Sequence, residues 1–197
     1  SRIHILNVLL KLRQWSNHPK LTQNESTINS GKFDNVTSYL ETLAKSKSKT
    51  LIFSSFVNHL ALYENWCYEN KIRYCTLTGN TATDDRENSV KQFQNDDDTL
   101  FFFISLKAGG VGLNLTKASY IIILDPWWNP FAEKQAIARA HRIGQENKVN
   151  VVRFITQNTI EEKILQLQEK KKELSESIID ESNIPEDIIE NLDFILA

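Results

Sequence analysis

The chain has 197 residues, 41% of them apolar and 24% charged, and its 23 Lys and Arg nearly balance its 25 Asp and Glu. These proportions exclude a disordered, a collagen-like and a disulfide-scaffold protein, and the length suits one domain with appendages. The longest apolar run, around residues 120–124, is far shorter than the roughly 20 residues that a membrane-spanning helix needs. Cys67 and Cys75 lack CxxC spacing and have apolar neighbours, so we expect buried thiols in a reducing compartment rather than a disulfide.

The net charge of −2 hides an asymmetry along the chain. Residues 1–155 carry 19 basic and 14 acidic side chains, a net charge of +5, whereas residues 156–197 carry 4 basic and 11 acidic ones, a net charge of −7. A mildly basic body with an acidic tail is therefore the better description, and it leaves nucleic acid open as a partner.

A first helix is expected over about Ile5 to Trp15, and short strand-like runs then alternate with helical patterns. The predicted strands are Thr50–Ser54, Arg73–Leu77, Thr99–Ser105, Tyr120–Leu124 and Val149–Ile155. The predicted helices between them are Phe33–Lys45, Val57–Asn70, Asp84–Gln94 and Phe131–Arg142. Near-continuous apolar strands separated by helices predict an α/β fold with a parallel sheet covered by helices on both faces.

Polar residues before several helices suggest where those helices begin. Capping boxes are expected at Asp84 with Glu87 and at Thr159 with Glu162, and Asn129 precedes an N1 proline at Pro130. A last helix is expected from Ile160 to about Ile178. Its apolar stripe of Ile164, Leu167, Leu174 and Ile178 should dock against whatever lies beside the sheet.

The loop after the third predicted strand is rich in glycine. In a parallel sheet, ligands bind at the carboxyl ends of the strands, so the loops that follow the strands should carry function. Residues 105–116 contain Gly109, Gly110, Gly112 and Asn114, whose backbone amides beside Lys107 would suit a phosphate, although a purely structural loop is equally compatible. No GxxxxGK[ST] motif occurs anywhere in the chain, so the phosphate-binding P-loop of nucleotide hydrolases is absent from it.

The helix expected after Pro130 places Gln135, Arg139 and Arg142 on one narrow stripe. Two arginines one turn apart could grip a triphosphate or another anion together, while the alternative is an ordinary solvated face. His141 has no Ser, Cys or carboxylate constellation around it, so we interpret it as a hydrogen-bonded structural histidine. The same interpretation applies to His4, His18 and His59, whose spacing suits no metal site.

The segment DPWWNP, residues 125–130, combines an acid at a strand end with two tryptophans in a loop. Exposing both indoles would be unusual unless one of them has a partner. Either Trp127 fills the core and Trp128 makes a contact, or the roles are reversed.

Taken together, these segments resemble one family. The order LRQWSNHPKL, SGKFDNV, KTLIFSSF, LTGNTATDDRENSVKQFQ, SLKAGGVGLNLT, DPWWNP and QAIARAHRIGQ is similar to the C-terminal RecA-like lobe of the Swi/Snf ATPases, which are double-stranded-DNA translocases of helicase superfamily two. The resemblance runs from about Leu6 to Ile179 and implies a three-layer P-loop-NTPase-type sandwich. It also implies an interlobe linker and helix over residues 1–30, the lobe over residues 31–156, and a brace helix with the acidic tail over residues 157–197.

The resemblance also implies a role in ATP hydrolysis. Arg139 and Arg142 match the arginine fingers that reach the γ-phosphate of ATP and Mg²⁺ held mainly by the N-terminal lobe, which is not part of this sequence. Gln135 matches a residue near the same nucleotide, and Gly109, Gly110, Gly112 and Asp125 would border it. On its own the 197-residue chain is therefore expected to be inactive as an ATPase.

For double-stranded DNA the matching positions are Ser54, Ser55, Thr78, Gly79, Ser105, Lys107 and Trp128. Arg86 also matches a family position, with a salt bridge inside the lobe as an equal alternative to a DNA contact. The implied partners are double-stranded DNA, the N-terminal lobe of the same protein and a DNA-bound protein target, without a membrane. The implied location is intracellular: the cytoplasm or nucleoid of a prokaryote, or the nucleus of a eukaryote. Two rival interpretations are a strand-separating helicase of the same superfamily and a degenerate clamp without ATPase activity.

Overall fold

The computed structural model describes residues 2–108, 113–138, 148–174 and 191–196. Its centre is a five-stranded sheet with the order β2-β3-β1-β4-β5, in which all neighbouring strands are parallel. The strands are β1 (Thr50–Ser54), β2 (Arg73–Leu77), β3 (Thr99–Ser105), β4 (Tyr120–Ile123) and β5 (Asn150–Arg153). The predicted parallel α/β fold is confirmed, and the bounds of β1, β2 and β3 agree with the sequence to the residue.

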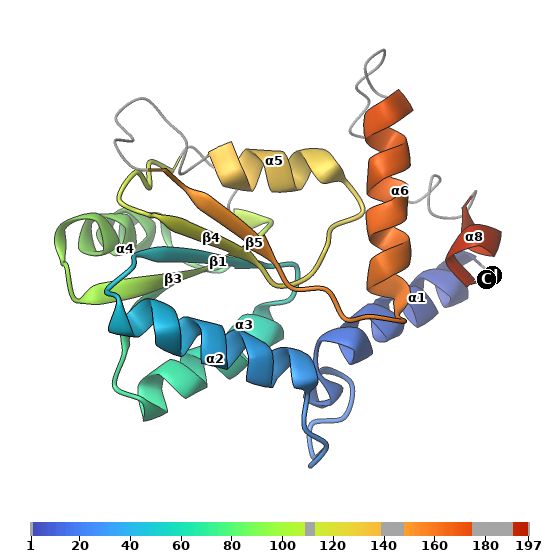
Figure 1. The fold of residues 1–197 in the computed structure, drawn as a ribbon, viewed down its shortest axis with the longest axis horizontal. Coiled ribbons are helices and arrows are strands. Elements are labelled where there is room, and N and C mark those ends of the chain that lie inside the picture. The colour runs from blue at the N-terminus through green and yellow to red at the C-terminus, as the bar shows by residue number, and fades with distance from the viewer. Residues whose placement is uncertain (1, 109–112, 139–147, 175–190, 197) are drawn as a thin grey trace.

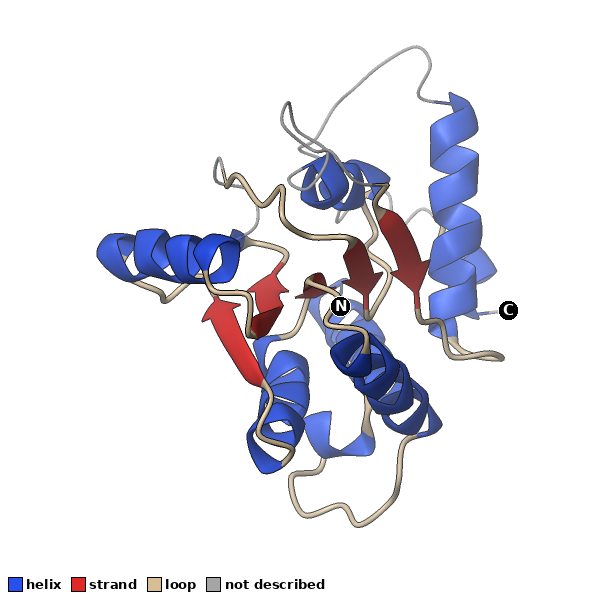
Figure 2. Ribbon diagram, turned by 60° about the vertical axis from the view of Figure 1, so that its left-hand side comes forward, coloured by secondary structure: helices blue, strands red, loops and turns tan. Residues whose placement is uncertain are grey.

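Helices cover both faces of this sheet (Figure 1). They are α1 (Arg2–Asn17), a 3-10 helix (Pro19–Leu21), α2 (Gly31–Lys45), α3 (Val57–Glu69), α4 (Thr83–Asn95), α5 (Pro130–Ala138), α6 (Ile160–Leu174) and α8 (Leu192–Leu196). Helices α2 and α3 pack on one face, and α4 and α5 on the other, as the turned view in Figure 2 also shows. The result is a three-layer sandwich in which helices lie on both faces of the sheet.

The core forms because successive side chains of each strand point to opposite faces of the sheet. In β3, Phe101 and Phe103 pack with the apolar side chains of α2 and α3, whereas Phe102 and Ile104 pack on the side of α4 and α5. Every residue of β1 and β3 is buried. These two strands are therefore central, and their near-continuous apolar sequences are what a strand covered on both faces requires.

A third apolar cluster lies beside the sheet, where α1 and α8 pack against α6 (Figure 1). Leu9 of α1, Ile160, Ile164 and Leu167 of α6, and Ile195 of α8 form it together with Trp128. The predicted docking stripe of the last helix is thus confirmed at Ile164 and Leu167. Its other two positions lie outside the side chains that the structure describes.

The helix starts correct one prediction and confirm others. Asp84 is not an N-cap: α4 begins one residue earlier, its N-cap Ala82 makes no side-chain hydrogen bond, and Asp84 lies in the first turn. There its negative charge still favours the helix dipole. The Asn129 cap is confirmed, because its side chain accepts a hydrogen bond from Phe131 N at 2.9 Å. Thr159 caps Glu161 N at 3.2 Å, but Glu162 reaches back to Asn158 N rather than to Thr159, so that box is confirmed in part.

Both cysteines are buried and free, as expected, and burial raises the pKa of Cys67 to about 12 and that of Cys75 to about 11. Such thiols stay protonated at neutral pH, which makes them poor nucleophiles. Within the described ranges, no helix combines the length and the apolar character needed to cross a membrane.

Candidate functional site at the carboxyl edge of the sheet

The predicted functional residues of the described loops converge on one edge of the sheet because parallel strands end at the same side. Ser54 and Ser105 are direct register partners at the ends of β1 and β3, and Leu106 N donates to the Ser54 carbonyl at 3.0 Å. Thr78 and Gly79 follow β2, and Asp125 follows β4 closely. The structure therefore brings together residues that are up to 71 positions apart in the sequence.

Exposure divides these residues into two groups. Gly79 and Lys107 are exposed, and Ser55 and Thr78 are half-buried, so all four present atoms to a ligand outside the sheet. Ser54 and Ser105 are buried. Among the described residues, the Ser105 hydroxyl is one of the buried polar groups without a hydrogen-bond partner. A direct contact to a ligand is thus available to the first group as the loops stand.

The turn after β2 is held by hydrogen bonds within the lobe. Thr78 N donates to the Thr81 hydroxyl at 3.0 Å, and Arg86 Nε donates to the Thr81 carbonyl at 2.9 Å. Arg86 therefore braces the turn that presents Thr78 and Gly79. The sequence left a salt bridge inside the lobe and a DNA contact as alternatives for Arg86. In the structure its guanidinium donates to a backbone carbonyl instead of an acidic side chain.

Asp125 is the centre of a buried polar cluster. Its carboxylate accepts hydrogen bonds from Ser54 Oγ at 2.5 Å, from Ser55 N at 3.2 Å to each oxygen, and from Arg13 Nη2 at 3.3 Å. Burial alone would raise the pKa of Asp125, but the His59 ring nitrogen 3.9 Å away, the charge of Arg13 and the bond from Ser54 together hold it at about 2. Its side chain is only 1% exposed, so the carboxylate is committed to partners inside the lobe. The nucleotide contact expected for Asp125 remains a prediction.

His59 completes this cluster from α3. Its Nδ1 lies 3.4 Å from Ser54 Oγ, and its Nε2 lies 3.2 Å from the Tyr63 hydroxyl. Burial lowers the pKa of His59, so the ring is neutral at pH 7 and one nitrogen donates while the other accepts. The interpretation of His59 as a hydrogen-bonded structural histidine is confirmed.

The two tryptophans of the DPWWNP loop have different surroundings. Trp128 is 8% exposed and packs in the third apolar cluster, whereas Trp127 is half-buried. The loop is anchored through Glu133 of α5, which accepts from Trp127 N at 3.0 Å and from Gln168 of α6 at 2.7 Å. The sequence left open which of the two tryptophans fills the core. In the structure Trp128 is the more buried of the two. The DNA contact expected for Trp128 stays a prediction.

The expected nucleotide-facing group is described only in part. Arg139, Arg142, Gly109, Gly110 and Gly112 lie outside the described residues, as does His141. Gln135 lies on α5 with an exposed side chain. Within the described ranges, no group of three or more His, Cys, Asp or Glu residues could hold a metal ion. The nucleotide contact expected for Gln135 therefore remains a prediction.

A second buried cluster at the junction of α1, α2 and α6 was not foreseen. Lys32 Nζ donates to Asn17 Oδ1 at 2.9 Å, to the Leu124 carbonyl at 2.8 Å and to both Glu161 oxygens at 2.6 and 2.7 Å. Burial lowers the pKa of Lys32 and raises that of Glu161, and their mutual attraction opposes both shifts.

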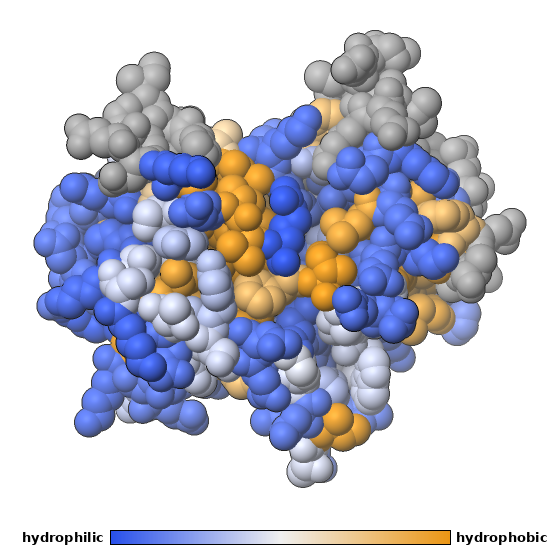
Figure 3. Space-filling view, in the orientation of Figure 1, coloured by the Kyte–Doolittle hydropathy of each residue, from blue (hydrophilic) through white to orange (hydrophobic). Residues whose placement is uncertain are grey.

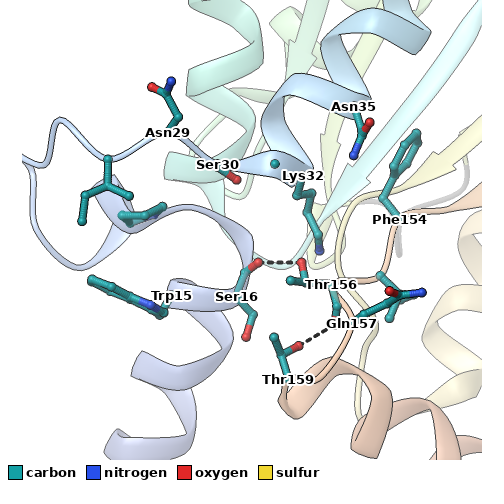
Figure 4. Close-up of a pocket in the computed structure, with 14 residues that line it drawn as sticks. Trp15, Ser16, Asn29, Ser30, Lys32, Asn35, Phe154, Thr156, Gln157 and Thr159 are labelled. Carbon is teal, nitrogen blue, oxygen red and sulfur yellow. Dashed lines mark hydrogen bonds between the residues drawn. The ribbon is translucent and has the colours of Figure 1, made fainter.

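This junction borders a cavity of about 650 Å³ between α1, α2 and the segment after β5 (Figure 4). Close by, Thr156 Oγ1 donates to the Ser16 carbonyl at 2.8 Å, which ties the end of α1 to the start of the α6 segment.

One signal in the sequence points to both clusters. Arg13 lies four residues after the buried Leu9 on α1, and Lys32 lies four residues before the buried Val36 on α2. Each is thus a charged residue within the apolar stripe of its helix, a place that such residues occupy only when they are paired. Their partners, 112 and 129 positions away, leave no such trace.

Comparison with known proteins agrees with this architecture. Residues 31–144 match the helicase conserved C-terminal domain. An ATP-dependent helicase of Schizosaccharomyces pombe is 48% identical over 138 residues, which cover 70% of this chain and 13% of that protein. The ATPase ISW1 of an ISWI chromatin-remodeling complex of Saccharomyces cerevisiae is 35% identical over 194 residues, which cover 92% of this chain and 17% of that protein. The chain therefore spans less than a fifth of the length of these curated relatives.

Among solved structures, the SWI2/SNF2 ATPase core of Sulfolobus solfataricus in complex with double-stranded DNA matches with a TM-score of 0.80 and 32% identity. The match covers 98% of this chain and 42% of that one. The fold and the arrangement of its loops define a RecA-like α/β lobe. The chain belongs to the helicase C-terminal domain family and is the C-terminal lobe of a Swi/Snf-type ATPase.

Proposed function

We propose that this chain is the second motor lobe of an ATP-dependent translocase that moves along double-stranded DNA. The observation that carries the proposal is the convergence of the loops after β1, β2 and β3 on one edge of the lobe, in a chain that matches a DNA-bound ATPase core over nearly its whole length. The lobe would act together with an N-terminal lobe of the same protein. Its place of action would be the compartment that holds the DNA.

The exposed atoms of this edge suit the DNA backbone rather than the bases. Lys107, the Ser55 and Thr78 hydroxyls and the chain at Gly79 offer one cation, hydroxyl donors and a position where no side chain keeps a phosphate away. Contacts of this kind neutralise or hydrogen-bond phosphates and carry no sequence information. A motor that steps along any sequence needs this kind of grip.

For ATP we propose that Arg139 and Arg142 supply positive charge to the phosphates of a nucleotide held with Mg²⁺ mainly by the N-terminal lobe. When bound, that nucleotide supplies the free energy of phosphoryl transfer. Gln135 is exposed on α5, and the sequence pattern predicts one helix stripe for Gln135 and both arginines. The isolated lobe would then hydrolyse essentially no ATP.

The test is ATP hydrolysis by the full-length protein with and without double-stranded DNA. We expect stimulation by DNA, loss of about 10³-fold or more in turnover for Arg142→Ala, and nearly unchanged DNA affinity. Lys134→Ala, which removes an exposed cation from the same helix region, is the matched control and should retain turnover. Lost DNA affinity in Arg142→Ala would contradict the assignment, and DNA binding without any ATPase activity in the wild type would favour a clamp.

A strand-separating helicase is the second candidate, because the Schizosaccharomyces pombe relative is described as an ATP-dependent helicase. Displacement of a third strand from a triplex requires only movement along the duplex, whereas displacement of one strand of the duplex requires its separation. We expect the full-length protein to displace the third strand alone. Displacement of a duplex strand would establish the helicase instead.

A further inference from the structure

Arg13 joins α1 to two loops of the carboxyl edge. Its Nη2 lies 3.0 Å from Ser55 Oγ, 3.3 Å from Asp125 Oδ2 and 3.2 Å from the Pro126 carbonyl. The guanidinium carbon lies 5.0 Å from the centre of the Phe56 ring, 5.3 Å from that of Trp127 and 5.6 Å from that of Trp128. The side chain is 5% exposed, so these groups replace water around the cation.

The Ser55 hydroxyl shows what this arrangement does. Ser55 N donates to Asp125, so the backbone amide is already used inside the lobe. The hydroxyl oxygen accepts from Arg13, which leaves its hydrogen as the one free donor of this residue. Because the oxygen turns a lone pair toward the guanidinium, the hydrogen is directed away from Arg13, and solvent reaches part of this half-buried residue.

We propose that Arg13 is a positioning residue that orients the Ser55 hydroxyl as a donor to a DNA phosphate and fixes the loop after β1 to the DPWWNP loop. The proposal rests on the proposed function, since Ser55 is a DNA contact only there. Lysine would not replace arginine in this role, because its ammonium lacks the planar face that lies over three aromatic rings.

The Lys32 cluster supplies a matched control. Lys32 is also a buried cation that holds a helix to the rest of the lobe, but its partners Asn17, Leu124 and Glu161 include no predicted DNA contact. Loss of either cation weakens the fold. Only loss of Arg13 should change how Ser55 acts.

The experiment is a double-mutant cycle on the dissociation constant of the full-length protein for double-stranded DNA. Arg13→Gln and Ser55→Ala should each weaken binding, and the double variant should bind no more weakly than the worse single variant. The coupling expected between them is at least about twofold. Lys32→Gln should leave the dissociation constant unchanged. Lys32→Gln combined with Ser55→Ala should therefore bind DNA like Ser55→Ala alone.

Additive effects of Arg13→Gln and Ser55→Ala would overturn the proposal, as would weakening by Lys32→Gln equal to that by Arg13→Gln. If Arg13→Gln does not fold, Arg13→Lys carries the same test, because it keeps a cation near Asp125. The readout is DNA binding alone, so an absence of DNA-stimulated ATPase would overturn the proposed motor function while this result stood.

Discussion

Two ion pairs are buried within the part of the lobe that the structure describes, and they differ in what they touch. Arg13 with Asp125 lies at the carboxyl edge, among the loops that follow β1 and β4. Lys32 with Glu161 lies where the end of α1 and the start of α2 meet the residue after β4 and the start of α6. In both pairs each side chain is at most 5% exposed. Removing each ion from water therefore costs on the order of several kcal/mol.

The difference lies in the neighbours. Lys32 is surrounded by one side-chain amide, one carbonyl and one carboxylate, none of which belongs to a predicted DNA contact. Arg13 instead donates to Ser55, and Asp125 accepts from Ser54. Both serines belong to the predicted DNA interface. A buried charge can therefore connect secondary-structure elements, as Lys32 does, or contact a side chain at the surface, as Arg13 does. The position of its hydrogen-bond partners distinguishes the two cases. Figure 3 shows one face of the molecule, which is largely hydrophilic with apolar patches near its centre.

Removing the Lys32 cation should have the largest effect on the free energy of unfolding. Lys32→Met leaves the Glu161 carboxylate buried with Thr156 N as its remaining described donor, and we expect a loss of about 3–5 kcal/mol in the free energy of unfolding. Denaturant titration of the 197-residue chain measures it. The double variant Lys32→Met with Glu161→Leu should regain most of the loss, because no uncompensated charge remains. A double variant as unstable as the single one would show that the pair is a net source of stability.

Acid should also weaken the Arg13–Asp125 pair, at a pH below that at which Glu161 takes up its proton. The pKa of Asp125 is about 2 in the folded chain against an ordinary value of 3.8, so the unfolded chain binds the proton more readily. The sign follows: the contribution of Asp125, about 2 kcal/mol, is present above pH 4 and is lost as the pH falls toward 2. Unfolding free energies measured from pH 5 to pH 2 check this. Asp125→Asn should flatten the curve in that window, and an unchanged slope would contradict the assignment.

An exposed ion pair at the opposite edge of the sheet should matter least. Arg73, at the start of β2, pairs with Asp96 and Asp98, and its side chain is 54% exposed. Exposed pairs contribute about 0–1 kcal/mol, so Arg73→Ala should change the midpoint of thermal unfolding only slightly and less at high salt. The matched measurement is Lys45→Ala, which removes an exposed pair with Glu41. A loss as large as that of Lys32→Met would show that exposure does not govern these pairs.

The strands and most helices could be predicted from local sequence because burial on both faces demands an uninterrupted apolar run. Thr99–Ser105 has such a run, and its bounds are those of β3. The start of α4 could not be predicted as well, because Thr83 enters the helix without a side-chain cap to mark the boundary. The order of the strands also had no local signal, since it depends on crossovers between segments far apart in the chain.

The candidate site divides in the same way. The resemblance to the Swi/Snf lobe named Ser55, Thr78 and Lys107 as DNA contacts, and the common direction of the strands explains why they lie at one edge of the sheet. That Asp125 faces inward and that Trp128 is packed beside α6 depends on side chains from α1, α3 and α6 that fill the space around them.

By itself the sequence determined the layers of this lobe and the edge of the sheet at which its predicted DNA contacts gather, because periodicity and strand direction are local properties. Only the tertiary structure decided which polar groups at that edge stay free. Arg13 and Asp125 lie 112 positions apart and pair inside the lobe, where Arg13 also donates to the Ser55 hydroxyl. Such pairings depend on packing in three dimensions, where desolvation allows a buried charge only beside its partner.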